Sequence, residues 1–385
     1  MSDARFARPR RAVVKVGSSS LRGASGTGVD RDLVADLARQ IAAVRDGGTE
    51  VVLVTSGAVA AGLVGLGMDA RPADLPSLQA AASVGQGRLM HTYAEAFAAH
   101  GVTCGQVLLT PDDVVQRERY LNARQTFTRL LELGAVPVVN ENDTVATDEL
   151  RFGDNDRLAA LVASMLGADL LVLLSDVEGL FDGDPRVDPQ APLLDRVEDF
   201  ALLDTRHFGS TGSDVGSGGM ASKLEAARIA SFSAAHAVIA DARRADVIPD
   251  VVAGAAVGTW FLPAERRPDS RKLWIAFAKP SAGTLTVDEG AARALTQRGS
   301  SLLAAGIVDV GGSFAAGDAV EVRDPAGVAI ARGLSSYAHD EVGRMRGRSS
   351  EALTREFGPA YERAVIHRDA LVVLVRDAAA GAGRG

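Results

Sequence analysis

Cysteine, lysine, histidine and long apolar runs are all scarce in this 385-residue chain. Cys104 is the single cysteine, which excludes an internal disulfide framework and a cysteine-based metal site. The six histidines are scattered, and none has the spacing of a metal ligand set. No uncharged apolar run reaches the roughly 18 residues of a membrane span. The basic start of the chain lacks the apolar segment of a secretory signal, so a reducing, cytoplasmic setting is the default expectation.

Lysine is scarce in a way that points to particular positions. Of the 41 basic residues only four are lysine, and two of these, Lys15 and Lys223, lie beside glycine-rich turns. Lysine carries a compact point charge, whereas arginine presents a planar fork. A lysine retained in an arginine-rich chain is therefore a candidate for direct contact with an anion. The alternative for Lys15 is an edge-strand side chain whose ammonium reaches solvent.

Length and charge restrict the domain organisation and the class of partner. A chain of 385 residues is too long for one typical core, and a net charge of -8 argues against tight non-specific binding to nucleic acid. The proline- and charge-rich segment 263–272 is the best domain boundary. We expect a first domain over residues 1–262, a linker over 263–281, a second domain over 282–377 and a disordered tail over 378–385.

Strand and helix patterns alternate through the first domain. Apolar strand-like runs are predicted at residues 11–16, 50–55, 103–109, 135–139, 170–174 and 238–240, the last of which is expected to be the final strand. Helical patterns are predicted at residues 30–45, 78–100 (interrupted by Gly85 and Gly87), 112–133, 158–166, 220–235 and 247–253. This alternation predicts an α/β fold with a mainly parallel sheet. Five short apolar runs after residue 282, at 284–287, 306–310, 319–322, 329–334 and 371–375, predict a small β-rich domain, a pseudo-barrel.

Small polar and acidic residues follow several of these predicted strands. Ser-Gly turns come after the first two, and residues 140–157 carry three Asn, four Asp and two Glu directly after the fourth. Loops at the carboxyl ends of parallel strands are where open α/β sheets bind ligands. The sequence therefore predicts a ligand site at this edge. The alternative is a solvated acidic loop.

A glycine- and serine-rich stretch, residues 209–219, leads into the helix that carries Lys223. A glycine-rich loop before a helix N-terminus suits an anion, although neither a Walker A nor a GxGxxG motif is present. The alternative is a mobile linker. Two lysines beside such turns, with acidic groups at other strand ends, favour phosphoryl transfer, which depends mainly on charge neutralisation and positioning. A carboxylate acceptor is already ionised near neutral pH, so it would need no general base.

Eight motifs combine these features. They are KVGSSSL at 15–21, VTSGAVAAG at 54–62, ASVGQGRL at 82–89, RERYLNAR at 117–124, PVVNENDTVAT at 137–147, FGDNDRLAA at 152–160, LLSDVEGLF at 173–181 and GGMASK at 218–223. Through them, residues 11–261 resemble the amino acid kinase family, and residues 282–377 resemble the PUA domain appended to many members. The resemblance implies a three-layer sandwich with a mainly parallel central sheet, followed by a β-rich PUA-like pseudo-barrel.

The resemblance also implies a reaction, because NENDTVA together with GDND is specific to members that act on glutamate. That reaction is transfer of the ATP γ-phosphate to the side-chain carboxylate of L-glutamate, which gives L-glutamyl 5-phosphate, in the first step of proline biosynthesis. It implies Mg²⁺ with ATP as co-substrate, feedback inhibition by proline, and a homo-oligomer (dimer or tetramer). It further implies handover of the product to glutamyl phosphate reductase, with no membrane partner.

Site residues carry over from the family motifs position by position. The resemblance assigns catalytic roles to Lys15, Lys223 and Asp156. It assigns glutamate binding to Ser56, Asp143 and Asn155. It assigns ATP binding to Lys15, Ser175, Asp176, Ser217, Gly218, Gly219, Met220, Ala221, Ser222 and Lys223.

Two other functions stay open at this point. One is a sibling kinase with another carboxylate substrate, such as aspartate. The other is RNA binding through the C-terminal domain, where Arg344, Arg346 and Arg348 form a small basic cluster. A solvated face or an interdomain contact is the alternative for that cluster.

Overall fold

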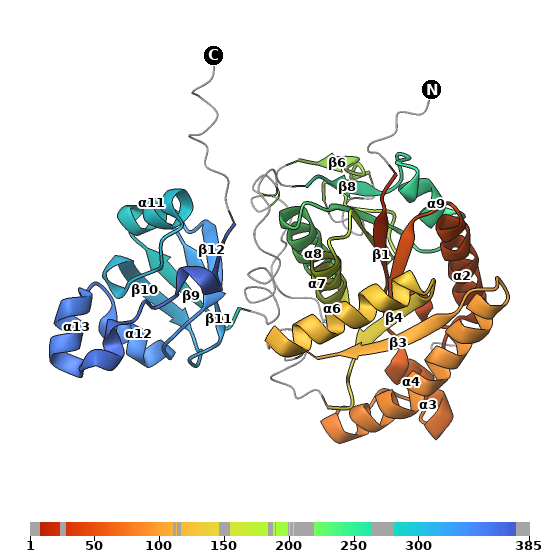
Figure 1. The fold of residues 1–385 in the computed structure, drawn as a ribbon, viewed down its shortest axis with the longest axis horizontal. Helices are drawn as coiled ribbons and strands as arrows, with labels where there is room; N and C mark the ends of the chain where they lie inside the picture. Colours follow the sequence, from red (N-terminus) through yellow and green to blue (C-terminus); the bar gives the residue numbers. More distant parts are fainter. Residues whose placement is uncertain are drawn as a thin grey trace, which may run out of the picture. The chain divides into compact units, whose positions relative to one another are not determined.

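A computed structural model describes residues 8–23, 28–110, 113, 117–145, 155–183, 188, 190–198, 200, 203, 219–263 and 281–374. The chain divides into two compact units, residues 1–267 and 268–385 (Figure 1). This division falls inside the predicted linker. Most of that linker and the predicted tail lie outside the described residues, so the finer domain limits stay predictions.

The first unit is built on one large sheet. Its strands are β1 (Arg11–Val16), β2 (Glu50–Val54), β3 (Cys104–Leu109), β4 (Val136–Glu141), β5 (Leu170–Ser175), β6 (Arg196–Val197), β7 (His236–Asp241) and β8 (Thr259–Phe261). Among the described residues they lie in the order β3-β4-β2-β1-β5-β7-β8-β6. The first six in that order are parallel, and only the β7–β8 pairing is antiparallel. The predicted mainly parallel sheet is confirmed.

Helices cover both faces of this sheet (Figure 1). On one face lie α2 (Arg31–Asp46), α4 (Leu75–Ala98) and α9 (Val247–Val252), and on the other lie α6 (Arg117–Glu132), α7 (Asn155–Leu166) and α8 (Met220–Phe232). Ala12, Val14 and Val16 of β1 belong to the same buried core as α2, α4 and α9. Because side chains alternate across a strand, Lys15 points to the opposite face, toward α7 and α8.

Most predicted elements of the first unit are confirmed, with shifted ends. Helix α7 begins at Asn155 rather than 158, and α4 begins at Leu75, where the Asp74 side chain accepts a hydrogen bond from the Ser77 N–H as the N-cap. Helix α3 (Ala58–Leu66), the short α1 (Ser18–Leu21) and strand β6 were not predicted. The run 238–240, expected to be the final strand of the sheet, is followed by β8. The sequence of α3 is rich in alanine and glycine, so its hydrophobic periodicity does not distinguish a helix from a turn.

The expectation that glycines interrupt the helix at residues 78–100 is wrong, because α4 is continuous. A Cβ added at Gly85 would lie 1.7 Å from the Ala58 carbonyl oxygen, and one at Gly62 would lie 1.8 Å from the Ala81 carbonyl oxygen. These two glycines therefore allow α3 and α4 to approach at backbone distance. The close approach holds α4 beside the turn that follows β2.

The second unit contains a separate sheet in the order β10-β9-β11-β12-β13. Its strands are β9 (Gly283–Val287), β10 (Ile307–Gly312), β11 (Ala319–Arg323), β12 (Ala329–Leu334) and β13 (Leu371–Val373). Each of the five predicted apolar runs forms one of these strands, so the predicted β-rich unit is confirmed. Sequence periodicity missed its helical segments, which are α11 (Glu289–Arg298), α12 (His339–Met345), α13 (Ser350–Phe357), η2 (Ala304–Gly306), η3 (Pro359–Glu362) and η4 (Arg368–Ala370).

The arginine cluster of the second unit makes local contacts. Arg344 donates to the Asp340 carbonyl oxygen at 3.3 Å, and Arg346 lies 3.4 Å from the Asp309 carboxylate. Arg348 pairs with Glu356 and lies over the ring of Phe357. Two of the three arginines therefore pair with local acids, which offsets part of the positive charge that would attract RNA. Among the described residues, none of the helices has both the length and the apolar character needed to cross a membrane.

Candidate active site

The carboxyl ends of four adjacent parallel strands define the candidate site. Lys15 is the penultimate residue of β1, Ser56 follows β2, Asn140 is near the end of β4, and Ser175 ends β5. Parallel pairing places these ends at one edge of the sheet. Helix α7 begins beside them with Asn155 and Asp156.

Two lysines meet one carboxylate at this edge. The Lys15 ammonium lies 2.5 Å from Asp156 Oδ1, and the Lys223 ammonium lies 3.1 Å from Asp156 Oδ2. Asp156 is fully buried, and the side chains of Lys15 and Lys223 are only 3% and 7% exposed. The Ser222 hydroxyl, at the start of α8, lies 3.0 Å from Asp156 Oδ2 as a donor. One carboxylate thus holds two cationic groups that come from a strand and a helix far apart in the sequence.

This cluster decides between the alternatives for Lys15. Strand β1 lies between β2 and β5 in the sheet, and Lys15 is 2% exposed. The interpretation of Lys15 as an edge-strand lysine with its ammonium in solvent is therefore wrong. The cluster brings two ammonium groups together in a buried setting. Buried cationic groups attract an anion more strongly than they would in water.

The electrostatics of Asp156 predict a pH dependence of stability. Burial alone would raise the pKa of its carboxyl, but the two lysine charges outweigh burial and hold the pKa below the ordinary value of 3.8. A carboxyl whose pKa is lower in the folded state stabilises the fold above its unfolded pKa, and this contribution is lost as the pH falls through the folded pKa. The stability advantage of the wild type over Asp156→Asn should therefore be constant from about pH 7 to about pH 5 and shrink below about pH 4.

Urea denaturation of both proteins between pH 3 and 7 measures this difference in the free energy of unfolding. A difference that stays the same down to pH 3 would contradict the pairing of Asp156 with the lysines.

An amide network lies next to the lysine cluster. The Asn155 side-chain NH₂ lies 2.7 Å from the Thr55 carbonyl oxygen, 2.8 Å from Ser56 Oγ and 2.8 Å from Asn140 Oδ1. Asn140 in turn donates to Gln86 Oε1 at 2.9 Å. Predicted site residues Ser56 and Asn155 are thus in direct contact, and Asp156 follows Asn155 in the chain. The alternative of a solvated acidic loop is wrong at both ends of its stretch, where Asn140 is 2% and Asp156 0% exposed.

Sequence reasoning missed the residues that support this network. Asn140, the penultimate residue of β4, and Gln86 both lie inside motifs named above, yet neither was given a role. Tyr93 of α4 was also missed; its hydroxyl lies 2.9 Å from the Thr55 hydroxyl, and burial raises its pKa above the ordinary value of 10.0. A neutral amide in a strand or helix pattern carries no signal of burial, so only the fold could single out these side chains.

A second ion pair joins the two helices that carry Asp156 and Lys223. Arg157 of α7 donates to the Glu225 carboxylate of α8 at 2.7 Å, and both side chains are largely buried. Each partner lies within two residues of a member of the lysine cluster. This pair therefore fixes the position of α8 against α7, where Lys223 must meet Asp156.

The other predicted residues are placed at the same edge or lie outside the described residues. Ser175 donates to the Asp176 carboxylate at 3.1 Å directly after β5, and Asp143 lies in the turn after β4. Gly219 is the N-cap of α8, whose first residues are Met220 and Ala221. Ser217, Gly218 and the rest of the predicted mobile linker up to Gly218 lie outside the described residues. The roles assigned to all of these residues stay predictions.

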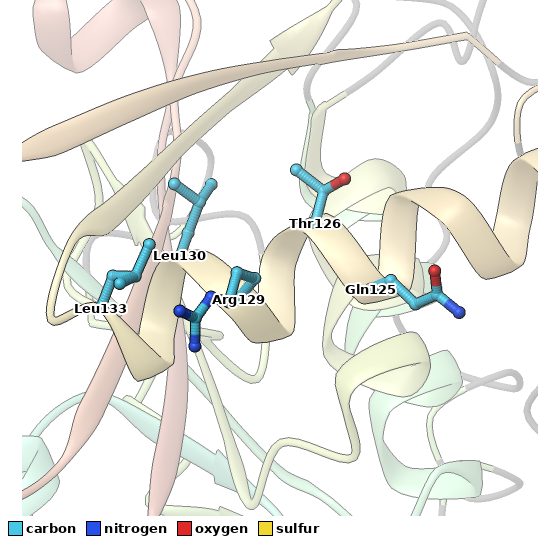
Figure 2. Close-up of a pocket in the computed structure, with 5 residues that line it drawn as sticks. All are labelled: Gln125, Thr126, Arg129, Leu130 and Leu133. Carbon is cyan, nitrogen blue, oxygen red and sulfur yellow. The ribbon is translucent and has the colours of Figure 1, made fainter.

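A shallow hollow on α6 is a different feature and not a candidate active site (Figure 2). It has a volume of about 360 Å³ and is lined by Gln125, Thr126, Arg129, Leu130 and Leu133. Its single charged residue, Arg129, pairs with Glu132 at 3.1 Å. A single helix and the residue after it supply the whole lining, which offers no group suited to acid–base, nucleophilic or phosphate chemistry.

No trio of His, Cys, Asp or Glu side chains within the described part of the chain is grouped so that it could hold a metal ion. The carboxylate at the centre of the site, Asp156, already contacts two ammonium groups, which makes it a poor ligand for a cation.

Comparison with known proteins agrees with both units. Residues 10–241 match the amino acid kinase family, and residues 283–357 match the PUA domain. A glutamate 5-kinase of Streptomyces coelicolor is 53% identical over 366 residues, which cover 95% of this chain and 96% of that protein. A glutamate 5-kinase of Syntrophotalea carbinolica is 47% identical over 364 residues, which cover 94% of this chain and 97% of that protein.

Proposed function

This chain belongs to the amino acid kinase family, and we propose that it transfers the γ-phosphate of ATP to the side-chain carboxylate of L-glutamate. The product is L-glutamyl 5-phosphate, and the reaction is the first step of proline biosynthesis. The buried Lys15–Asp156–Lys223 cluster supports the proposal most directly, because it places positive charge where a phosphoryl group would pass. Similarity over nearly the whole chain to glutamate 5-kinases supports glutamate as the acceptor.

The reaction requires the protein mainly to position the two substrates and to neutralise the charge of the transferred phosphoryl group. The attacking carboxylate of glutamate is ionised near neutral pH, since its ordinary pKa is about 4.3, and it needs no general base. In phosphoryl transfer, negative charge is spread over the oxygens of the transferred group. Lys15 and Lys223 offset that charge, and Asp156 holds one ammonium group at each of its two carboxylate oxygens.

Substrates are assigned to the two sides of the lysine cluster. Glutamate binds to Ser56, Asp143 and Asn155, where a carboxylate and an amide oxygen suit its α-ammonium. ATP binds along the end of β5 and the start of α8, through Lys15, Ser175, Asp176, Ser217, Gly218, Gly219, Met220, Ala221, Ser222 and Lys223.

Kinase activity with ATP implies a divalent metal, and we assign it as Mg²⁺. Mg²⁺ prefers oxygen ligands, keeps several waters and is commonly held in part by substrate phosphates. The described residues fit a metal delivered by the nucleotide, since the central carboxylate is committed to lysines. Bound in this way, Mg²⁺ would share in neutralising the phosphate charge.

Regulation and assembly extend the same proposal. The enzyme is inhibited by proline, the end product, and it works in the cytoplasm as a homo-oligomer, a dimer or tetramer. Acyl phosphates hydrolyse readily in water, so the product is handed to glutamyl phosphate reductase. Addition of proline to the activity assay tests the inhibition. Sedimentation analysis of the purified chain tests the oligomeric state.

A substrate panel tests the proposed function against its sibling. ADP release should require glutamate and Mg²⁺, and aspartate should support at most about 1% of the rate, because its side chain is one methylene shorter and misplaces the attacking carboxylate. Activity with aspartate but not with glutamate would overturn the proposal and favour the sibling kinase.

A further inference from the structure

We propose that Gln86 is a positioning residue of the acceptor site: through Asn140 it fixes the amide of Asn155, so that the Asn155 side-chain oxygen faces the amino acid substrate. The inference rests on the proposed function, in which Asn155 binds glutamate. Gln86 lies on α4, the helix that also carries Tyr93. Its carbonyl oxygen accepts the hydrogen bond from Asn140 at 2.9 Å.

Two backbone atoms fix the direction of every amide in this chain of contacts. The Thr55 carbonyl oxygen can only accept, so the Asn155 atom 2.7 Å from it must be the NH₂ group. The Glu141 N–H can only donate, so the Asn140 atom 2.9 Å from it must be the side-chain oxygen. The NH₂ group of Asn140 therefore faces Gln86, which must present its oxygen. Asn155 and Asn140 cannot be reversed without breaking a contact to the backbone, and Gln86 cannot be reversed without losing its contact to Asn140.

This fixed direction leaves one acceptor available at the substrate end. Asn155 Oδ1 is buried and has no hydrogen-bond partner among the described residues. Burying a hydrogen-bond acceptor without a partner lowers the stability of the fold, so we infer that Asn155 Oδ1 accepts a hydrogen bond from a ligand. A lone acceptor suits the α-ammonium group of an amino acid and repels a carboxylate. The direction of the Asn155 amide therefore decides which end of glutamate can lie against it.

The support that Gln86 gives depends on the packing of its helix. Gly85, the preceding residue, allows α4 to approach within backbone distance of Ala58 in α3, as described above. This contact places Gln86 within reach of Asn140, which is 2% exposed. Removing the Gln86 oxygen would leave a buried NH₂ group of Asn140 without this acceptor. Asn140 would then rotate to find another partner and release the Asn155 amide.

Steady-state kinetics of Gln86→Met tests the inference. Methionine matches the length of glutamine but offers Asn140 no oxygen. The KM for glutamate should rise about 3- to 10-fold, the size expected for one lost hydrogen bond. The KM for ATP should stay within about twofold of the wild-type value, because the nucleotide does not contact this network. Gln125→Met, on the exposed face of α6 (Figure 2), is the matched control and should change neither constant.

A double substitution shows whether Gln86 acts through Asn140. Asn140→Ala should raise the KM for glutamate by itself, and adding Gln86→Met to it should change that constant by less than about twofold. Three outcomes overturn the inference: an unchanged KM for glutamate in Gln86→Met, equal increases in the KM values for glutamate and ATP, or fully additive effects in the double variant. A wild-type protein without activity on glutamate would instead overturn the proposed function, and the inference would fall with it.

Discussion

Replacing Lys223 with methionine is expected to lower kcat at least about 100-fold, as does the loss of one group that stabilises charge in the transition state. Methionine keeps most of the volume of the side chain, so the packing of α8 should change little. The Lys223 ammonium is buried and lies 3.1 Å from Asp156, at the N-terminal end of α8. Solvent therefore cannot replace its charge, which under the proposed function stabilises the reacting group.

The KM values and the melting temperature distinguish this role from a structural one. A transition-state role predicts a large loss in kcat, KM values for both substrates within about threefold of the wild-type values, and a Tm that stays above the assay temperature even though the lost ion pair with Asp156 lowers it. Arg71→Met, which removes an exposed cation between α3 and α4, is the control and should have normal kcat. A near-normal kcat in Lys223→Met would make Lys223 a structural residue.

Replacing Asp156 with asparagine is expected to damage both stability and catalysis. The substitution keeps the shape of the side chain and removes the negative charge that both buried lysines contact. Removing one partner of a buried ionic group costs about 3–5 kcal/mol of folding free energy. The kcat should also fall, on the order of 100-fold, because the two ammonium groups then repel each other without the carboxylate between them.

Urea denaturation at pH 7 measures the loss in the free energy of unfolding. Steady-state kinetics at saturating substrate measure the loss in kcat. Asp176→Asn is a useful comparison, because Asp176 is exposed and its carboxylate accepts from Ser175 rather than from a lysine. It should lose much less stability than Asp156→Asn. Equal stability of Asp156→Asn and the wild type would contradict a carboxylate that holds two buried cations.

The sequence predicted the strands of both sheets better than the helices. A buried parallel strand such as β5 is a continuous apolar run, which can be recognised in the sequence without knowledge of the strands beside it. Helix α3 is rich in alanine and glycine, and its reason for being helical, the close contact of Gly62 and Gly85 with the facing backbone, exists only in the folded chain. The α-helices of the second unit, such as α12, are short, so their periodic patterns are weak.

The sequence predicted the charged residues of the site and the neutral residues Ser56 and Asn155, but it missed the neutral side chains that support them. Lys15 and Lys223 stood out because lysine is rare in this chain, and the structure brings both to Asp156. Gln86 and Asn140 did not stand out, because a glutamine in a helix is usually a solvated side chain. Their importance follows from hydrogen-bond geometry between α4, β4 and α7, which no spacing along the sequence encodes.

Trapping of the acyl phosphate by hydroxylamine tests the central claim most directly. Purified protein with ATP, Mg²⁺ and L-glutamate should form glutamyl hydroxamate in step with ADP, and formation should fall on the order of 100-fold in Lys223→Met. Release of ADP without hydroxamate, or hydroxamate formation that is undiminished in the Lys223 variant, would contradict phosphoryl transfer to glutamate at the Lys15–Asp156–Lys223 cluster.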